Sequence, residues 1–259
     1  MDVLSDVITV MRTGTPRSAR FERREPWEQH YPPVPGSLGF HVVVSGTCRL
    51  EDMTLQAGDI VVVSDQEHTM SGESPCVTLC GAYEVDPSRL HPLLRSLPPL
   101  LRTSSPSAVS LLNAELAYPA LGSDALVPAM LDVLLVHALR AWCTTVGEGW
   151  AAALRDHPVT TALQAMHDTP AAPWTVAKLA ATAGLSRATF ARRFTAYTGQ
   201  PPLTYLTWWR MTLAARVLRS TDAPLSSVAA GVGYASEFAF AAAFKRSFGV
   251  APGRYRRSS

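Results

Sequence analysis

The second half of the chain carries two successive blocks in which apolar residues recur at helical spacing around a short turn. The blocks repeat each other at an offset of 50 residues. The recurring positions are Ser186, Phe190, Phe194, Gly199, Pro202 and Tyr205, which return as Ser236, Phe240, Phe244, Gly249, Pro252 and Tyr255. A repeat of this length indicates one supersecondary unit used twice. A short helix, a tight turn and a second helix that opens at a serine predict a helix-turn-helix unit.

Capping residues and glycines set the expected helix boundaries in this half. Thr175 is the expected N-cap of a helix over 176–183, and Ser186 caps the next helix. Gly184 between them supplies a turn in which a positive φ costs little. Further helices are expected over 156–168, 204–220, 226–232 and 236–248. The expected buried stripe of the 204–220 helix is Tyr205, Trp208, Met211, Ala215 and Leu218. This rigid helix would fix the separation of the two units.

The first half is predicted to form short β-strands. Residues 40–50 (FHVVVSGTCRL) and 55–63 (LQAGDIVVV) are rich in β-branched residues around Gly turns, and residues 77–79 begin another strand. Short strands with Gly and Asp turns at this spacing predict an antiparallel sandwich or barrel.

A helical region is expected between the halves. Residues 104–110 are an expected polar loop, and a helix follows Ser123 and Asp124 and runs to about Trp142. Apolar residues cover most of its circumference, so we expect burial on more than one side. It could pack on the barrel and on a partner subunit, or form an intramolecular core alone. The expected fold class is therefore α+β, with a β-barrel over 1–102, a helical linker and dimerisation region over 103–150, and an all-α domain with two helix-turn-helix units over 151–259.

Charge is divided unevenly along the chain. Residues 151–259 hold 13 Lys and Arg against 4 Asp and Glu, a net charge of +9. Residues 1–150 hold 10 against 17, a net charge of −7. A basic half joined to an acidic one is typical of a nucleic-acid-binding domain attached to a domain with another role. Tandem helix-turn-helix units would read two successive major-groove segments of double-stranded DNA.

The N-terminus and the cysteines indicate the compartment. Asp2, Asp6 and Arg12 interrupt any core of a signal peptide. The four cysteines contain no CxxC pair and no zinc-finger spacing. We therefore expect a cytoplasmic protein with reduced thiols.

The helix that follows Ser186 is the expected first reading helix. Turning away from Phe190 and Phe194 brings its outer face toward DNA, and the expected base-reading residues there are Arg187, Ala188, Thr189, Ala191 and Arg192. The guanidinium of Arg192 can donate to guanine O6 and N7 together. Ser186 and Arg193 are expected to contact phosphates, which position the protein without specifying sequence.

The second reading helix, after Ser236, presents an apolar outer face. Its expected base-facing residues are Glu237, Phe238, Ala241 and Ala242. Ala242 is the repeat equivalent of Arg192, so this helix cannot make the guanine contact and is expected to pack on thymine methyls. The expected phosphate contacts are Ser236, Lys245, Arg246, Arg254 and Arg256. We therefore expect the first helix to supply most of the hydrogen-bonded specificity.

Histidines and cysteines are the candidates for chemistry in the first half. His30, His41 and His68 could converge on a metal ion, because neutral imidazoles suit Zn, Fe or Cu. Histidines packed in the core or at the rim of the barrel are the alternative. Cys48 and Cys80 lie in strand-like segments and are redox candidates, with inert buried thiols as the alternative. No cofactor is predicted, and an effector or metal in the barrel is left open.

The second half resembles the AraC/XylS family of bacterial transcription regulators over about residues 174–257. The stretch GYASEFAFAAAFKRSFGVAPGRYR (233–256) is similar to the family's C-terminal signature. It departs from that signature at Ala242, where many members carry Arg, and at the bulky Phe238.

The first half resembles the cupin-type sensory domain fused to one branch of this family. Gly58 and Asp59 precede an apolar strand and His68, an arrangement similar to the second cupin motif. The sequence lacks the HxH pair with which cupin enzymes hold a metal, and Gly39 stands where their Glu would fall.

The resemblance implies a sequence-specific transcriptional regulator, and not an enzyme, whose promoter binding responds to a signal sensed in the cupin-like domain. It implies a homodimer that meets RNA polymerase if it is an activator, without a membrane partner. Some members of this branch respond to oxidants through cysteines. The alternatives are a cupin metalloenzyme with a DNA-binding tail, a DNA repair methyltransferase fused to the same module, and a non-specific architectural DNA binder. The missing metal ligands argue against the first alternative.

Overall fold

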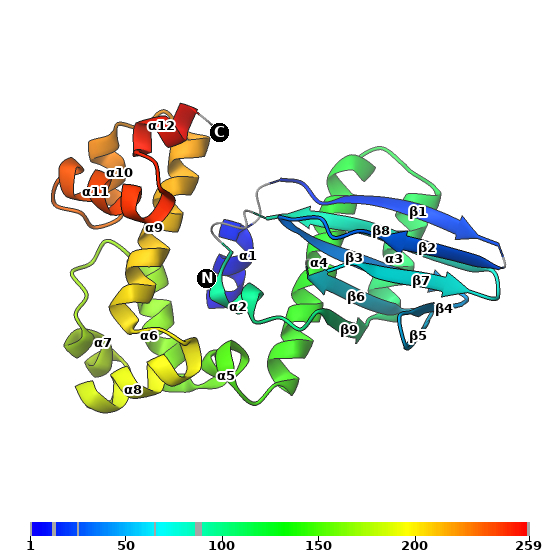
Figure 1. The fold of residues 1–259 in the computed structure, drawn as a ribbon, viewed down its shortest axis with the longest axis horizontal. Helices are drawn as coiled ribbons and strands as arrows, with labels where there is room; N and C mark the ends of the chain where they lie inside the picture. Colours follow the sequence, from blue (N-terminus) through cyan, green and yellow to red (C-terminus); the bar gives the residue numbers. More distant parts are fainter. Residues whose placement is uncertain (1, 12–13, 25, 65, 86–89, 258–259) are drawn as a thin grey trace. The chain divides into compact units, whose positions relative to one another are not determined.

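The computed structural model describes residues 2–11, 14–24, 26–64, 66–85 and 90–257. The chain divides into two compact units. One comprises Met11–Thr145 and is called the β-sandwich unit. The other combines Met1–Val10 with Val146–Ser259 and is called the helical unit (Figure 1).

Two antiparallel sheets form the β-sandwich unit, which confirms the predicted strand-rich first half. The five-stranded sheet has the order β1-β8-β3-β6-β9, built from Arg17–Arg23, Cys76–Glu84, Ser37–Ser45, Asp59–Ser64 and Leu100–Ser104. The four-stranded sheet has the order β2-β7-β4-β5, built from Trp27–Tyr31, His68–Gly72, Thr47–Leu50 and Met53–Gln56.

The core between the two sheets receives residues from both. Its buried members are Val43, Cys48, Leu50, Leu55, Val61, Val63, Met70 and Cys76. Strand β6 is buried along nearly its whole length, because α4 (Ser123–Thr145) packs on its other face. A strand covered on both faces needs a continuous apolar run in place of an alternating one, which explains the sequence IVVV over residues 60–63.

Gly46 lets the chain pass from one sheet to the other. The predicted strand segment 40–50 is broken at this residue, with β3 in the five-stranded sheet and β4 in the four-stranded sheet. Gly46 has a φ of +80°, and a Cβ placed there would lie 2.3 Å from the carbonyl oxygen of Pro75. Both the backbone conformation and the close approach therefore require glycine.

Three helices belong to the β-sandwich unit: α2 (Pro92–Arg95), α3 (Pro106–Ala117) and α4. The expected polar loop over 104–110 is wrong, since Ser104 ends β9 and Pro106 begins α3. Proline is favourable at the first position of a helix, where its missing N–H has no intrahelical acceptor. Val109 and Leu112 bury one face of this helix.

Helix α4 carries the longest apolar stretch. By length and composition alone this helix could cross a membrane. The core helix of a water-soluble protein meets the same two criteria. Its buried side faces α3, β6 and β9. The buried residues are Met130, Leu131, Leu134, Leu135, Ala138, Leu139, Trp142 and Cys143. We therefore describe it as a core helix of the β-sandwich unit.

The helical unit contains both repeats. Its helices are α1 (Val3–Met11, whose last residue falls in the other unit), α5 (Gly149–Arg155), α6 (His157–Asp168), α7 (Val176–Thr182), α8 (Arg187–Thr198), α9 (Pro202–Ser220), α10 (Leu225–Gly231), α11 (Glu237–Phe248) and α12 (Pro252–Arg257). The pairs α7–α8 and α10–α11 are the two helix-turn-helix units. The predicted helices of this half are confirmed, with ends that differ by one to two residues.

The buried stripe of α9 includes Trp209 and not the expected Trp208. Trp209 is 1% exposed, because the His167 ring stacks on its indole with a centroid distance of 4.0 Å. His167 is also held by the Tyr205 hydroxyl, 2.6 Å from Nε2. The Asp6 carboxylate of α1 lies 3.2 Å from His167 Nδ1, so the N-terminal helix is anchored on this core.

We predict that Gly46→Ala lowers the free energy of unfolding by about 1–3 kcal/mol, because a Cβ strains this backbone conformation and meets the Pro75 carbonyl. In a chain of this size the melting temperature should fall by about 2–4 °C per kcal/mol. The matched control is Gly147→Ala, whose added Cβ would have no heavy atom within 4 Å. Equal melting temperatures for the two variants in a circular-dichroism melt would contradict the role of Gly46.

Candidate nucleic-acid interface and pocket of the β-sandwich unit

Helix α8 is oriented by two phenylalanines one turn apart. Phe190 and Phe194 are fully buried. The Ser186 side chain caps the helix by accepting the Thr189 N–H at 3.3 Å. On the outer side, three expected base-reading residues (Arg187, Ala188 and Arg192) are exposed, and two (Thr189 and Ala191) are half-buried. This leaves a surface of small side chains flanked by two guanidinium groups.

Arg193 lies on the same helix but has a partner inside the unit. Its Nε donates to Asp156 Oδ2 at 2.8 Å. Asp156 also caps α6, because its other oxygen accepts the Val159 N–H at 3.1 Å. Arg193 therefore holds α8 against α6, and a phosphate at Arg193 would have to compete with this ion pair.

Helix α11 repeats the same geometry with a different outer face. Phe240 and Phe244 are fully buried, and Ser236 accepts the Ala239 N–H at 3.2 Å. Glu237 and Phe238 are exposed, with the Phe238 side chain 86% accessible, whereas Ala241 and Ala242 are half-buried.

The expected phosphate-binding cations of the second helix-turn-helix unit differ in their surroundings. Lys245, Arg246 and Arg254 are exposed, as is Ser236. Arg256 is half-buried and donates from Nη2 to the carbonyl oxygen of Ala223. It therefore fastens α12 to the segment after α9, whereas the other three cations point into solvent.

Helix α9 connects the two helix-turn-helix units and packs against both. It contacts α8 on one side and α10, α11 and α12 on the other. Its 19 residues span about 28 Å at about 1.5 Å per residue. Successive major-groove faces of B-DNA lie about 34 Å apart, so a helix of this length suits two reading helices on one side of the duplex.

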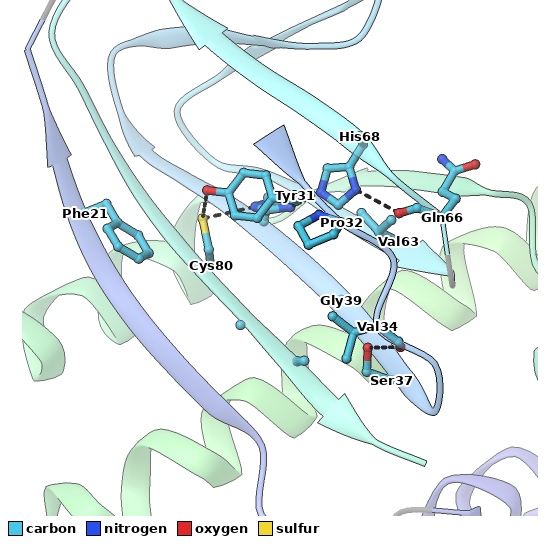
Figure 2. A pocket seen from close by; sticks show the side chains of 13 residues that line it. Phe21, Tyr31, Pro32, Val34, Ser37, Gly39, Val63, Gln66, His68 and Cys80 are labelled. Atoms are coloured by element: carbon cyan, nitrogen blue, oxygen red, sulfur yellow. Dashed lines mark hydrogen bonds between the residues drawn. The ribbon is translucent and has the colours of Figure 1, made fainter. Parts of the chain in front are cut away.

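The β-sandwich unit contains a pocket of about 280 Å³ (Figure 2). Its wall is largely apolar, and Gly39 lies in it, at the position where cupin enzymes carry a metal-binding Glu. His41 and His68 meet in the wall, with 2.7 Å between their Nε2 atoms. His41 Nδ1 lies 3.0 Å from Cys80 Sγ, and the Tyr31 hydroxyl lies 3.5 Å from the same sulfur.

The expected convergence of three histidines is wrong for His30. This residue is exposed and its Nδ1 lies 3.4 Å from the Thr69 hydroxyl. Side chains alternate along a strand, so when Tyr31 of β2 points into the pocket, His30 points out. Among the residues described here, no group of three His, Cys, Asp or Glu side chains is placed to hold a metal ion.

The four cysteines are buried and reduced. Cys48 and Cys76 both lie in the core between the sheets, and the neighbouring Cys76 thiol together with burial raises the pKa of Cys48. Cys80 instead lines the pocket, and burial raises the pKa of its thiol. The redox role predicted for Cys48 and Cys80 stays a prediction.

Sequence reasoning missed Tyr31 and Cys76 as partners of the predicted cysteines. The segment WEQHY, residues 27–31, alternates aromatic and polar residues as a half-buried strand does. That alternation was the available signal for Tyr31. The Cys48–Cys76 contact joins strands from different sheets, so spacing along the chain contains no sign of it.

Comparison with known proteins agrees with this architecture. Residues 2–144 match a family described as cupin, and residues 179–258 match one described as a helix-turn-helix domain. A putative AraC-like transcription regulator from Streptomyces lividans is 34% identical over 300 aligned positions, covering 99% of this chain and 98% of that protein. A protein of the same description from Streptomyces antibioticus is also 34% identical and covers 99% of each chain.

A further relative is the RCS-specific HTH-type transcriptional activator RclR of Escherichia coli strain K12. It is 32% identical over 240 aligned positions, which cover 85% of this chain and 84% of that protein. The similarity to the two Streptomyces proteins therefore extends over both the cupin half and the helix-turn-helix half. The chain therefore belongs to the AraC-like transcription regulators, with a cupin domain before a double helix-turn-helix domain.

Proposed function

We propose that this regulator reads promoter DNA with α8 and α11 inserted in successive major-groove segments, under the control of a signal received by the β-sandwich unit. The observation that carries the proposal is the exposed Arg192 on a helix whose opposite face is locked by Phe190 and Phe194. A guanidinium held in this way can donate two parallel hydrogen bonds to a guanine edge.

The two reading helices contribute differently. Arg187 and Arg192 give α8 hydrogen-bond donors, and Ala188 and Ala191 allow the backbone to approach the bases. Phe238 and the two alanines give α11 an apolar face that suits thymine methyl groups. The first helix therefore supplies most of the discrimination between base pairs.

Phosphate contacts come mainly from the second helix-turn-helix unit. Lys245, Arg246 and Arg254 are exposed cations around α11 and α12. Ser186 and Ser236 lie at the N-termini of the reading helices, where backbone N–H groups favour phosphate. Arg193 would contact a phosphate only by giving up its ion pair with Asp156. Arg256 would likewise have to give up its hydrogen bond to the Ala223 carbonyl oxygen.

A homodimer is proposed through the α3–α4 surface. Large apolar side chains are exposed there in solvent: Leu111, Tyr118, Leu121, Leu126 and Val133. Several large apolar side chains exposed on one helix pair are the kind of surface that a partner subunit would cover. The dimerisation region over 103–150 and the DNA-binding domain over 151–259 stay part of the proposal, whereas the sensory barrel predicted over 1–102 lacks Met1–Val10, which belong to the helical unit.

The remaining assignments follow from the relatives, which are named as regulators. In this proposal the protein acts by binding and not by catalysis, it works in the cytoplasm, and it contacts RNA polymerase if it is an activator.

We predict that Arg192→Ala abolishes site preference while keeping non-specific affinity. The loss should be about 1–3 kcal/mol at the guanine position, because two hydrogen bonds to its edge disappear. The measurement is selection of fragments from the DNA around the protein's own gene, followed by titration of the selected site. Arg49→Ala, which removes an exposed charge from strand β4 of the β-sandwich unit, is the control. An unchanged preference in Arg192→Ala would remove Arg192 from base reading.

Lys245→Ala should weaken binding to all DNA sequences alike. Since one phosphate contact is lost, the slope of log K against log salt should become shallower by about one unit. The slope is measured by fluorescence anisotropy with specific and scrambled duplexes. If the site preference changed and the slope did not, Lys245 would contact a base in place of a phosphate.

Val133→Glu should raise the dimer dissociation constant by at least about tenfold, equivalent to about 1.4 kcal/mol, because an unpaired carboxylate would be buried at the interface. Analytical ultracentrifugation of the full chain gives the constant. Val217→Glu makes the same change at an exposed valine of α9 and should not affect it. A wild-type chain that stays monomeric would refute the proposed dimer.

A further inference from the structure

The pocket of the β-sandwich unit places a thiol beside an unusual pair of imidazoles. Cys80 Sγ, His41 and His68 form a continuous chain of contacts, with 3.0 Å from Sγ to His41 Nδ1 and 2.7 Å from His41 Nε2 to His68 Nε2. Figure 2 shows Tyr31, Cys80 and His68 in the wall of this pocket. A thiol next to a base that is itself oriented by a third group is the arrangement that activates nucleophiles.

The far end of the chain fixes the direction of every hydrogen bond. His68 Nδ1 lies 3.1 Å from the carbonyl oxygen of Gln66, which can only accept, so Nδ1 carries the proton. In a neutral His68, Nε2 is then an acceptor, and His41 must donate to it from Nε2–H. This leaves His41 Nδ1 unprotonated and facing Cys80, whose S–H donates to it.

His41 acts as a relay because it cannot itself hold a positive charge. Burial, with a smaller contribution from His68, lowers the pKa of His41 to about 3. If the Cys80 proton moves to His41 Nδ1 while the Nε2 proton moves to His68, His41 stays neutral throughout. The charge then rests on His68, where the Gln66 carbonyl oxygen stabilises the imidazolium.

A hydroxyl beside the sulfur would stabilise a thiolate. The Tyr31 hydroxyl lies 3.5 Å from Sγ and can donate to it. At rest the thiol is protonated, because burial raises the pKa of Cys80. The nucleophile is therefore generated only as its proton leaves along the relay, which favours reaction with a molecule already held in the pocket.

The lining of the pocket defines the class of that molecule. Phe21, Val34 and Val63 make the wall apolar, and Gly39, where an added Cβ would have no heavy atom closer than 3.6 Å, leaves space in it. A volume of about 280 Å³ suits a small molecule of roughly drug-fragment size. An apolar, uncharged electrophile is therefore favoured over a hydrated anion.

We propose that Cys80 is a covalent site for small apolar α,β-unsaturated carbonyl compounds. The sulfur forms a bond to the β-carbon, and the electron pair of the C=C bond moves to the α-carbon as an enolate. The proton held by His68 then returns through His41 or water to the α-carbon. The addition needs no oxidant. This inference rests on the proposed sensory function and names the signal that the β-sandwich unit would receive.

The test uses the full chain and trans-cinnamaldehyde as the probe. Adducts are trapped by borohydride reduction and located by tandem mass spectrometry, so the result does not depend on any variant. We expect Cys80 to react at least about tenfold faster than Cys48, Cys76 and Cys143, with a rate that saturates as the probe concentration rises. Equal rates at the four cysteines, or reaction only after denaturation, would overturn the proposal.

Two variants separate chemistry from structure. Cys80→Ser should abolish the fast adduct, whereas Cys143→Ser should retain it. His68→Ala should slow the addition at Cys80 by at least about tenfold, since general-base catalysis contributes on the order of a hundredfold or more. Added imidazole should restore the rate, which a merely structural role of His68 would not allow. A His68→Ala variant that keeps the wild-type rate and melting temperature would refute the relay.

DNA binding is measured separately, with the site selected by the unmodified chain. A changed affinity after addition at Cys80, absent in Cys80→Ser, would join the covalent site to regulation. An adduct without any effect on DNA binding would keep the covalent site and refute its role as the signal. Failure of the unmodified chain to select any DNA would instead count against the proposed function.

Discussion

The contact on which the DNA-reading surface depends is the pair of buried phenylalanines in each reading helix. Phe190 with Phe194, and Phe240 with Phe244, are fully buried, and burial of each ring contributes about 1.5–3 kcal/mol. Because residues four apart lie on one side of a helix, fixing two of them fixes the direction of all the others. Arg192 faces outward for this reason alone. Helix α9 then holds both pairs at a set separation, so the outer faces act as parts of one surface.

The sequence predicted the helical unit well because its signals are local. Serine caps, phenylalanines at i and i+4, and glycines at positive φ (Gly199 and Gly249, both at +74°) each act within a few residues. Trp209 is buried in place of the predicted Trp208 because His167, from another helix, stacks on its ring. The N-terminal helix α1 was missed for a similar reason, since its anchor at His167 lies some 160 residues away along the chain.

The β-sandwich unit was predicted in outline only, because strand register is set by neighbours far apart in the sequence. The prediction that three histidines converge holds for His41 and His68, which contact each other. It fails for His30, because the sequence did not reveal the register of β2 and hence which of its side chains face the pocket. The pocket draws His41 and Cys80 from the five-stranded sheet and Tyr31 and His68 from the four-stranded one. A molecule bound there would contact both sheets and would change the distance between them. His41 pairs with Val61 of β6, and β6 packs under α4, which gives a contiguous path from the pocket to the α3–α4 surface.

The unequal reading helices divide specificity from affinity. In α8 the cations Arg187 and Arg192 stand on the base-facing side, while Arg193 is held by Asp156. In the second unit the outer face is apolar and the exposed cations Lys245, Arg246 and Arg254 stand around it. Phosphate contacts act on any sequence, whereas a bidentate guanidinium contact acts on one base pair. Under the proposed function, the second helix-turn-helix unit would hold the protein on DNA while the first tests the sequence. A signal that shifts the spacing of two dimer-related chains could then change site choice without changing either reading helix.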